Sequence, residues 1–284
     1  MEDSYEIINN RFKIFKKWFI GSGGFSRVFM GYDTEQSKYV IIKVYNTQKT
    51  LKNEIEMLEY LKCTGIVPQI YANGKFNNTK NFVIMENLGI SLHKIIQKNN
   101  KNEKLGLGPC LYFMYELIHC NKKIHNLGII HRDVKPSNVV IHDKSIYLID
   151  FGLAIRKEHA ENVKTVGTNH YMSINSHNIE PKNYDEYDDI ESCFYTLIYL
   201  LKGRLPWTNQ KDKEIENSKK HLKTKMTKFS KLIQQIMQLC FNKNDKDIHT
   251  NIMKIIEDYL LNRNSSIQNE KEKFFLFVDA VNSY

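Results

Sequence analysis

The sequence predicts an α+β protein with two lobes, a small β-rich lobe over residues 11–87 and a larger α-helical lobe over residues 88–284. Residues 12–44 are rich in aromatic and β-branched residues with strand-like alternation, whereas apolar residues after position 90 mostly recur at spacings of three and four. Residues 1–10 are expected to be a short N-terminal extension. The length of 284 residues suits one domain of two lobes rather than several domains.

The expected elements follow in chain order. Strands are predicted within residues 12–44 and over residues 81–85, and between them lies a helix over residues 51–61, with Leu51, Ile55, Leu58 and Leu61 on one stripe. Residues 86–89 are expected to connect the lobes. A hairpin is predicted from residues 139–141 and 146–149, and residues 262–273 are expected to form a polar break before an apolar end. Further helices are predicted over residues 91–97, 109–126, 189–201, 231–240 and 251–261.

Composition excludes several classes of protein. Five scattered cysteines without a C-x-x-C pair argue against a disulfide framework and a zinc site. No apolar run reaches the roughly 20 residues of a membrane span, and the acidic start has no secretory signal behind it. We therefore expect a monomer inside the cell, cytoplasmic or nuclear and not secreted. The net charge of +9 attracts anions, and binding of nucleic acid is compatible with it but has no other support.

The most informative segment is HRDVKPSN at residues 131–138, followed after the predicted hairpin by DFG at residues 150–152. Asp133 is suited to accept a proton from a hydroxyl, and Lys135 to neutralise a transferring phosphoryl group. Asn138 and Asp150 would supply oxygen ligands to Mg²⁺. A turn with a capping carboxylate would explain either half of the pattern, but not both together. The segment therefore predicts phosphoryl transfer.

A glycine-rich segment precedes this motif. Gly21, Gly23 and Gly24 would let the backbone approach phosphate oxygens, although a plain hairpin turn would also use them. Lys43 on the following strand is the candidate for binding the α- and β-phosphates. Glu54 on the predicted helix is its expected partner.

Two other carboxylates compete for this role. Glu54 is preferred to Glu56 and Glu59 because Ile55, Met57 and Leu58 set the helix face toward Lys43. A surface position for Glu54 remains the alternative.

These motifs resemble the eukaryotic protein kinases, over nearly the whole chain. Within that family, GTNHYMSINSH at residues 167–177 is similar to the G-T-x-x-Y-x-S-I-N-x-H of the casein kinase I group, with the vaccinia-related kinases as neighbours. DDIES at residues 188–192 and LPW at residues 205–207 look like further motifs of that group. The resemblance implies the bilobal protein kinase fold. Lys135, two residues after Asp133, is the serine/threonine form of the loop.

The resemblance also implies a nucleotide site. Met85 would be the gatekeeper, residues 86–88 the adenine-binding hinge, and Asp189 the carboxylate that braces the catalytic loop. ATP is expected to contact Ile20, Gly21, Ser22, Gly23, Gly24, Phe25, Ser26, Val28, Ile41, Lys43, Met85, Glu86, Leu88 and Val140, with Mg²⁺ on Asn138 and Asp150.

The chain departs from the family pattern at several places. Ser26 stands for a glycine, and Ile41 stands where the family has an alanine over the adenine. Both bear on nucleotide affinity. Glu186 and Tyr187 occupy the place of an arginine pair that would hold an anion, which bears on phosphate-primed substrates. The segment over residues 152–167 is short and offers Thr165 as the one candidate switch.

The leading prediction is a serine/threonine protein kinase that uses MgATP. A catalytically weak scaffold that binds partners is the alternative suggested by Ser26 and Ile41, but a scaffold has no need of Lys43, Asp133, Asn138 and Asp150 together. A small-molecule kinase of similar fold typically lacks the lysine at 135. Acidic protein substrates are expected because lysines gather after Trp207, at Lys211, Lys213, Lys219, Lys220, Lys223, Lys225, Lys228 and Lys231. A solvated basic face without a role in binding would show the same run of lysines.

Overall fold

The computed structural model describes residues 5–24, 26–76, 80–99, 105–177, 181–224 and 229–282; Phe25, Lys225 and Lys228 lie outside this part, as does the side chain of Lys223. The chain divides into two compact units, one of Met1–Gly89 with Tyr147–Ala154 and one of Ile90–Ile146 with Ile155–Tyr284. No helix within the described ranges is long and apolar enough to span a membrane.

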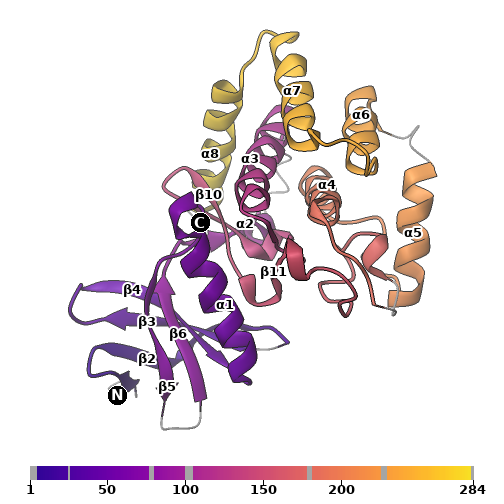
Figure 1. Ribbon diagram of the computed structural model, residues 1–284. Coiled ribbons are helices and arrows are strands. Elements are labelled where there is room, and N and C mark those ends of the chain that lie inside the picture. Colours follow the sequence, from indigo (N-terminus) through magenta and orange to yellow (C-terminus); the bar gives the residue numbers. More distant parts are fainter. Residues whose placement is uncertain are drawn as a thin grey trace. The chain divides into compact units, whose positions relative to one another are not determined.

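The first unit is an antiparallel sheet with one long helix (Figure 1). Its strand order is β1-β2-β3-β4-β6-β5. The strands are β1 (Tyr5–Ile8), β2 (Phe12–Ser22), β3 (Ser26–Asp33), β4 (Lys38–Tyr45), β5 (Ile70–Phe76) and β6 (Lys80–Glu86), and α1 is Gln48–Leu61. The expected extension therefore contains a strand, in which Ile8 is buried in one cluster with Phe12 while Ile7 is exposed on the other face.

The two faces of this sheet have different roles. Val40 and Ile42 of β4 belong to a buried apolar cluster on one face. Lys43 alternates with them and turns to the other face, where it meets Glu54 of α1. Thr47 caps α1 by accepting a hydrogen bond from the amide of Thr50. The sheet thus separates an apolar core from a face that carries charge.

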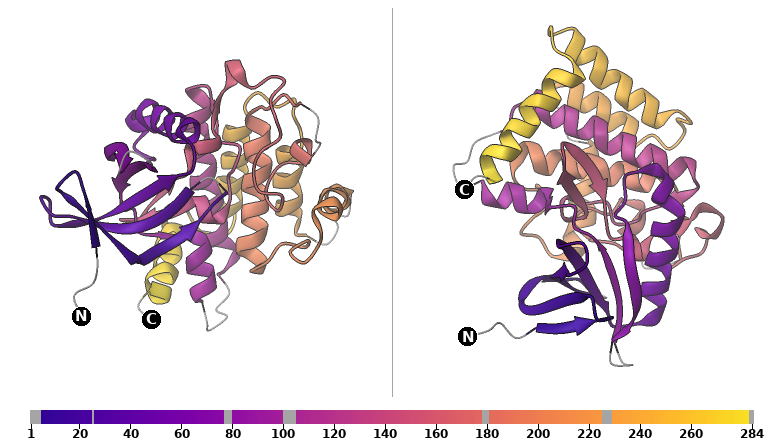
Figure 2. Two further views of the ribbon diagram at one scale, coloured as in Figure 1. Left: turned by 90° about the horizontal axis from the view of Figure 1, so that it is seen from below. Right: turned by 90° about the vertical axis from the view of Figure 1, so that its left-hand side faces the viewer.

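The second unit is mostly helical (Figure 2). Its helices are α2 (Leu92–Lys98), α3 (Leu107–Asn126), α4 (Glu186–Lys202), α5 (Asp212–Thr224), α6 (Lys231–Cys240), α7 (Ile248–Leu261) and α8 (Ile267–Asn282), with short strands β7 (Ile90–Ser91), β8 (Ile129–Ile130), β9 (Val139–His142), β10 (Ser145–Leu148) and β11 (Ile155–Arg156). Helix α3 packs against α4, α7 and α8, and the rings of Phe113 and Phe274 lie 5.7 Å apart.

Helix α4 shows how the sequence sets an element in this unit. Asp185 and Asp188 form a capping box at its start, and Gly203 ends it in the left-handed conformation with φ of 72°. The predicted hairpin and the predicted helix over residues 231–240 are confirmed. One expectation is wrong, because α8 begins at Ile267, within the expected polar break. Helix α5 and strand β5 were not predicted from the sequence.

Candidate active site

The glycine-rich segment forms the turn between β2 and β3. Gly21 lies opposite Val28 in the register, and the amide of Gly23 donates to the carbonyl of Ser26 at 2.9 Å. A Cβ added at Gly21, Gly23 or Gly24 would meet no described atom within 4 Å, and none of the three has positive φ. Neither packing nor backbone conformation in the described residues calls for glycine here, which leaves close approach of a ligand as a reason for them.

Lys43 lies between two carboxylates of the first unit. Its Nζ is 2.7 Å from Oε2 of Glu54 and 2.7 Å from Oδ1 of Asp150. Burial lowers the pKa of Lys43, but the charges of Glu54 and Asp150 outweigh burial and hold the pKa above its ordinary value. The ammonium is therefore charged and fixed in direction.

Glu54 is the most buried member of this cluster, with 1% of the residue exposed. Besides Lys43 it accepts a short hydrogen bond from the hydroxyl of Tyr45. Burial raises the pKa of Glu54 and the charge of Lys43 opposes this. Glu56 and Glu59, the rival carboxylates, are both exposed. Helix α1 thus presents Glu54 inward, as the pattern of its apolar neighbours predicts, although Ile55 is less buried than Met57.

The sheet register brings further predicted residues to the face of Lys43. Val28 of β3 lies opposite Lys43, and Ile41 lies opposite Met85 of β6. Side chains directly opposite each other in an antiparallel pair share a face of the sheet. Val28, Ile41 and Met85 therefore surround the strand position from which Lys43 extends.

The other predicted nucleotide contacts lie at the ends of strands. Ile20 and Ser22 belong to the last part of β2, and Ser26 is buried at the start of β3. Glu86 ends β6, where its amide donates to the carbonyl of Gln69 at 2.8 Å. The remaining two predicted contacts are both buried, Leu88 in the first unit and Val140 on β9 in the second. Phe25 lies outside the described residues.

In the second unit, Asp133 is the centre of a compact polar network. Lys135 Nζ lies 2.6 Å from Oδ2 of Asp133, and the hydroxyl of Thr168 donates to Oδ1 at 2.7 Å. Lys135 also donates to Oγ1 of Thr168 at 2.7 Å. The amide nitrogen of Asn138 donates to the backbone carbonyl and to Oδ2 of Asp133, at 2.9 and 3.1 Å. The carboxylate is thus held by three side chains.

The loop that carries Asp133 is braced by Asp189 of α4. The two oxygens of Asp189 accept the backbone amides of His131 and Arg132 at 2.7 and 2.8 Å, and His125 lies at 3.0 Å. Burial raises the pKa of Asp189, but the hydrogen bond and charge of His125 bring it below its ordinary value. An ionised carboxylate therefore fixes the backbone immediately before Asp133, and Arg132 has a φ of 65° there.

The structure brings Lys43, Glu54 and Asp150 together in one unit, and Asp133, Lys135 and Asn138 in the other. Sequence reasoning missed Tyr45. Its signal was present, because it lies two residues after Lys43 on one strand and so shares its face. It also missed His125, for which helical periodicity gave no signal.

One lysine of the expected basic run is misassigned. Lys219 is fully buried, with none of the residue exposed, whereas Lys211, Lys213, Lys220 and Lys231 are exposed. Lys219 donates to backbone carbonyls rather than facing solvent. It is therefore not part of a basic surface.

Comparison with known proteins agrees with this geometry. A relative from Dictyostelium discoideum, "Probable serine/threonine-protein kinase", is 36% identical over 224 residues, which is 73% of this chain but 44% of the relative. "Putative casein kinase I" from Caenorhabditis elegans is 28% identical over 253 residues, covering 82% of this chain and 72% of that protein. The family model for the protein kinase domain matches residues 15–270, and the chain therefore belongs to the protein kinase family.

Proposed function

We propose that the chain is a serine/threonine protein kinase of the casein kinase I group, with vaccinia-related kinases as neighbours, which transfers the γ-phosphoryl group of ATP to Ser and Thr hydroxyls of proteins. The observation that carries the proposal is the network of Asp133, Lys135 and Thr168, in which every hydrogen bond is 2.7 Å or shorter. Residues 11–87 and 88–284 are the two lobes in this proposal. The protein would act as a monomer in the cytoplasm or nucleus.

The roles of the residues follow from their chemistry. Asp133 would orient the acceptor hydroxyl and accept its proton, while Lys135 would offset charge on the γ-phosphoryl group. Lys43, held by Glu54, would bind the α- and β-phosphates. The remaining nucleotide contacts would be those predicted from the sequence.

Mg²⁺ would be held by Asp150 and Asn138. A carboxylate and an amide oxygen are the hard donors that this ion prefers. The side chain of Asp150 is 41% exposed and uses Oδ1 for Lys43, so the donor types present fit the ion. When bound, Mg²⁺ would neutralise charge on the phosphates.

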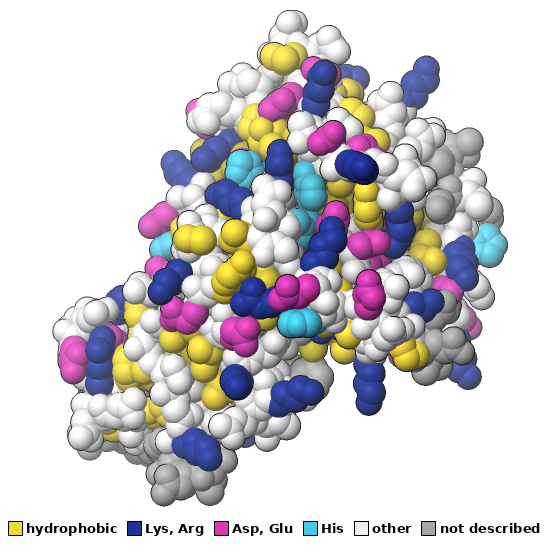
Figure 3. Space-filling model, viewed as in Figure 1, with side chains coloured by type: hydrophobic (Ala, Val, Ile, Leu, Met, Phe, Trp, Pro, Cys, Tyr) yellow, Lys and Arg dark blue, Asp and Glu magenta, His cyan; other side chains and the backbone are white. Residues whose placement is uncertain are grey.

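Substrates with diffuse acidity are favoured over phosphate-primed ones. Figure 3 shows basic side chains interspersed with acidic ones over the face drawn, without one large basic patch there. Glu186, at the position where the family has an arginine, makes an ion pair with Lys157 at 2.7 Å. That carboxylate would repel an anion at this position. The preference rests on the exposed lysines near α5 and on the net charge of +9.

We also propose activity without phosphorylation of Thr165. The guanidinium of Arg132 lies 5.2 Å from the ring centre of Tyr184, whose hydroxyl accepts the amide of Val166 at 3.1 Å. This arrangement orders the residue after Thr165 without a phosphate. Phosphatase-treated protein and a Thr165→Ala variant should both keep activity, and a large loss in both would show that the phosphate is required.

The decisive experiment is phosphorylation of a peptide array with MgATP. Asp133→Asn should abolish transfer while ATP binding persists, since Asp133 acts on the hydroxyl and not on the nucleotide. Asp143→Asn is the matched control, because its carboxylate is 86% exposed in a turn. Turnover by Asp133→Asn close to that of the unmodified protein would refute the role assigned to Asp133. If substrates on the array strictly require a phosphorylated residue, the proposed preference for diffuse acidity is wrong.

A further inference from the structure

Lys219 is a cation buried in the second unit for which the proposed reaction has no direct use. It extends from α5, and its Nζ donates to the carbonyls of Asn169 and Met172 at 2.7 and 2.5 Å. Nζ also lies 2.9 Å from Nε2 of His177. All three partners belong to one segment, residues 169–177, so a single side chain contacts this segment at three points.

The three contacts use all three N–H donors of an ammonium group. His177 can accept, because burial and the charge of Lys219 lower its pKa to about 4 and leave the ring neutral. The rings of Tyr195 and Trp207 lie 4.8 and 5.6 Å from Nζ and present aromatic surface to the cation. Burial lowers the pKa of Lys219 to about 7, against the charge of Glu191, and so opposes protonation. The protonated form is favoured instead by the contacts themselves, which are three hydrogen-bond acceptors and two aromatic rings.

A buried carboxyl group holds the same segment from α4. Oε1 of Glu191 accepts the amide of Ile174 at 2.7 Å and the hydroxyl of Tyr195 at 2.6 Å. Lys219 thus donates to two carbonyl groups of the segment, and Glu191 accepts from an amide that lies between Met172 and His177. Contacts from two helices therefore fix the path of residues 169–177.

This segment is joined directly to the Asp133 network. Thr168, which bonds both Asp133 and Lys135, is the residue before Asn169, whose carbonyl Lys219 holds. Consecutive Cα atoms are about 3.8 Å apart, so a shift at residue 169 moves Thr168 as well. A displacement of roughly 1 Å at a reacting group can cost a hundredfold in rate.

We propose that Lys219 is a positioning residue for the acceptor peptide, which acts by fixing residues 169–177 and, through Thr168, the direction of Asp133. The inference rests on the proposed kinase function. The proposal is carried by the bonds of Thr168 to Asp133 and Lys135, since Asp133 is the residue proposed to orient the acceptor hydroxyl. ATP binding has no part in these contacts.

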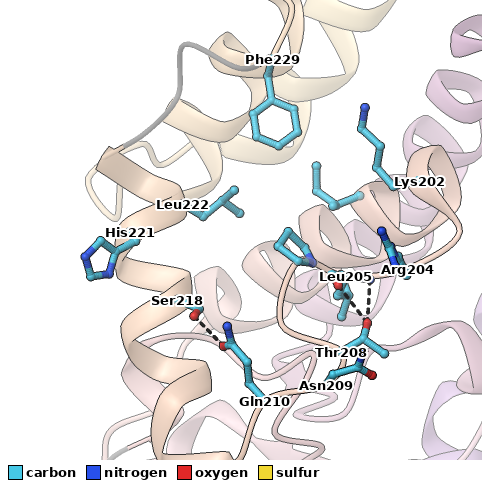
Figure 4. A pocket seen from close by; sticks show the side chains of 12 residues that line it. Lys202, Arg204, Leu205, Thr208, Asn209, Gln210, Ser218, His221, Leu222 and Phe229 are labelled. Atoms are coloured by element: carbon cyan, nitrogen blue, oxygen red, sulfur yellow. Dashed lines mark hydrogen bonds between the residues drawn. The ribbon is translucent and has the colours of Figure 1, made fainter.

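Helix α5 has other attachments, so it does not depend on Lys219 alone. Ile215 of α5 is fully buried. A cavity of about 850 Å³ lies beside the helix, and at its lining the hydroxyl of Ser218 donates to Gln210 at 2.6 Å (Figure 4). These contacts should keep α5 folded when the ammonium is removed.

The test compares Lys219→Met with Lys254→Met. Lys254 lies on α7, is exposed, and is not one of the lysines proposed to attract acidic substrates. Lys219→Met should reduce kcat/KM for a peptide substrate by roughly ten- to a hundredfold, with a raised KM for peptide and an unchanged KM for ATP. Lys254→Met should match the unmodified protein. His177→Phe, which removes one acceptor, should shift the peptide KM in the same direction by less, and decides the question if Lys219→Met does not fold.

A structural role alone would lower kcat in proportion to the folded fraction and leave both KM values unchanged; that result would overturn the proposal. Hydrogen exchange provides a readout that does not need activity. Amides of residues 169–177 should exchange faster in Lys219→Met than in Lys254→Met. If the unmodified protein phosphorylates no peptide, the proposed function fails, whereas equal exchange in the two variants refutes the positioning role.

Discussion

Replacing Lys43 by Met should destabilise the first unit strongly, because it leaves a buried carboxylate without its cation. Lys43 is 6% and Glu54 1% exposed, so neither charge is well solvated. Removing one partner of a buried ion pair costs about 3–5 kcal/mol in the free energy of unfolding. Exposed pairs contribute at most about 1 kcal/mol. Lys62→Met is the matched control, since the Lys62–Glu59 pair at 3.0 Å is exposed on both sides.

The double variant Lys43→Met/Glu54→Met tests the cause of this loss. With both charges gone, this cluster no longer holds a buried carboxylate, and Asp150 is exposed enough to be hydrated. The double variant should therefore be more stable than Lys43→Met, with a coupling energy of about 2–3 kcal/mol from the mutant cycle. The assay is urea unfolding of the full chain at one pH. Additive losses from the two single substitutions would refute the reasoning.

The change in stability of Lys43→Met with pH is an independent test of the same reasoning. Burial already raises the pKa of Glu54, and loss of Lys43 raises it further. A carboxyl group whose pKa is raised in the folded state loses stability as pH rises through that pKa, because only the folded state favours the proton. Lys43→Met should thus lose stability as pH rises above 4.5, the ordinary pKa of a glutamate, and the double variant should lack this loss.

Three other outcomes are expected. Ile41→Ala should admit bulkier ATP-competitive ligands, at a cost of about 1–2 kcal/mol for a half-buried site, and unchanged inhibitor selectivity would count against Ile41 lying over the purine. Gly167→Ala should lose most activity, because Gly167 has φ of 118° and an added Cβ would lie 2.7 Å from the carbonyl of Arg132; near-normal turnover would contradict this. Burial lowers the pKa of His249 from 6.5 to about 4, so the free energy of unfolding should fall as pH falls from 6.5 toward 4, by about 1–2 kcal/mol at pH 5. His249→Gln should show a smaller fall, and an equal pH dependence of both proteins in urea unfolding would refute this prediction.

The elements that sequence reasoning found are those with a regular apolar pattern. Helix α6 has such a stripe and was predicted at its observed bounds. Helix α5 has no comparable stripe, because its buried face combines Ile215 with Lys219. The first turns of α8 are polar, and their buried residue is Glu270, which accepts the hydroxyl of Ser265 at 2.6 Å and Lys273 at 2.7 Å. Periodicity cannot detect a helix whose inward positions are charged.

Within the candidate site, residues close in sequence could be predicted and long-range partners mostly could not. The spacing of Asp133, Lys135 and Asn138 specifies their chemistry directly. The burial of Lys219 depends on carbonyls 50 and 47 residues away, which no local pattern reveals. A lysine in a run of lysines looks solvated until the fold shows what surrounds it.

Asn53 of α1 joins this helix to the segment that carries Asp150. Its side-chain amide donates toward the carbonyls of Gly152 and Ala154, both at 3.0 Å, and of Phe151 at 3.4 Å. Helix α1 and residues 151–154 therefore move together. A drug-like ligand that binds only when Phe151 turns outward must also displace α1. Few molecules are in that state at any time, and the apparent affinity of the ligand is reduced in proportion to their fraction. Asn53→Ala should make the chain more sensitive to such ligands, and equal inhibition of both forms would show that the two parts move separately.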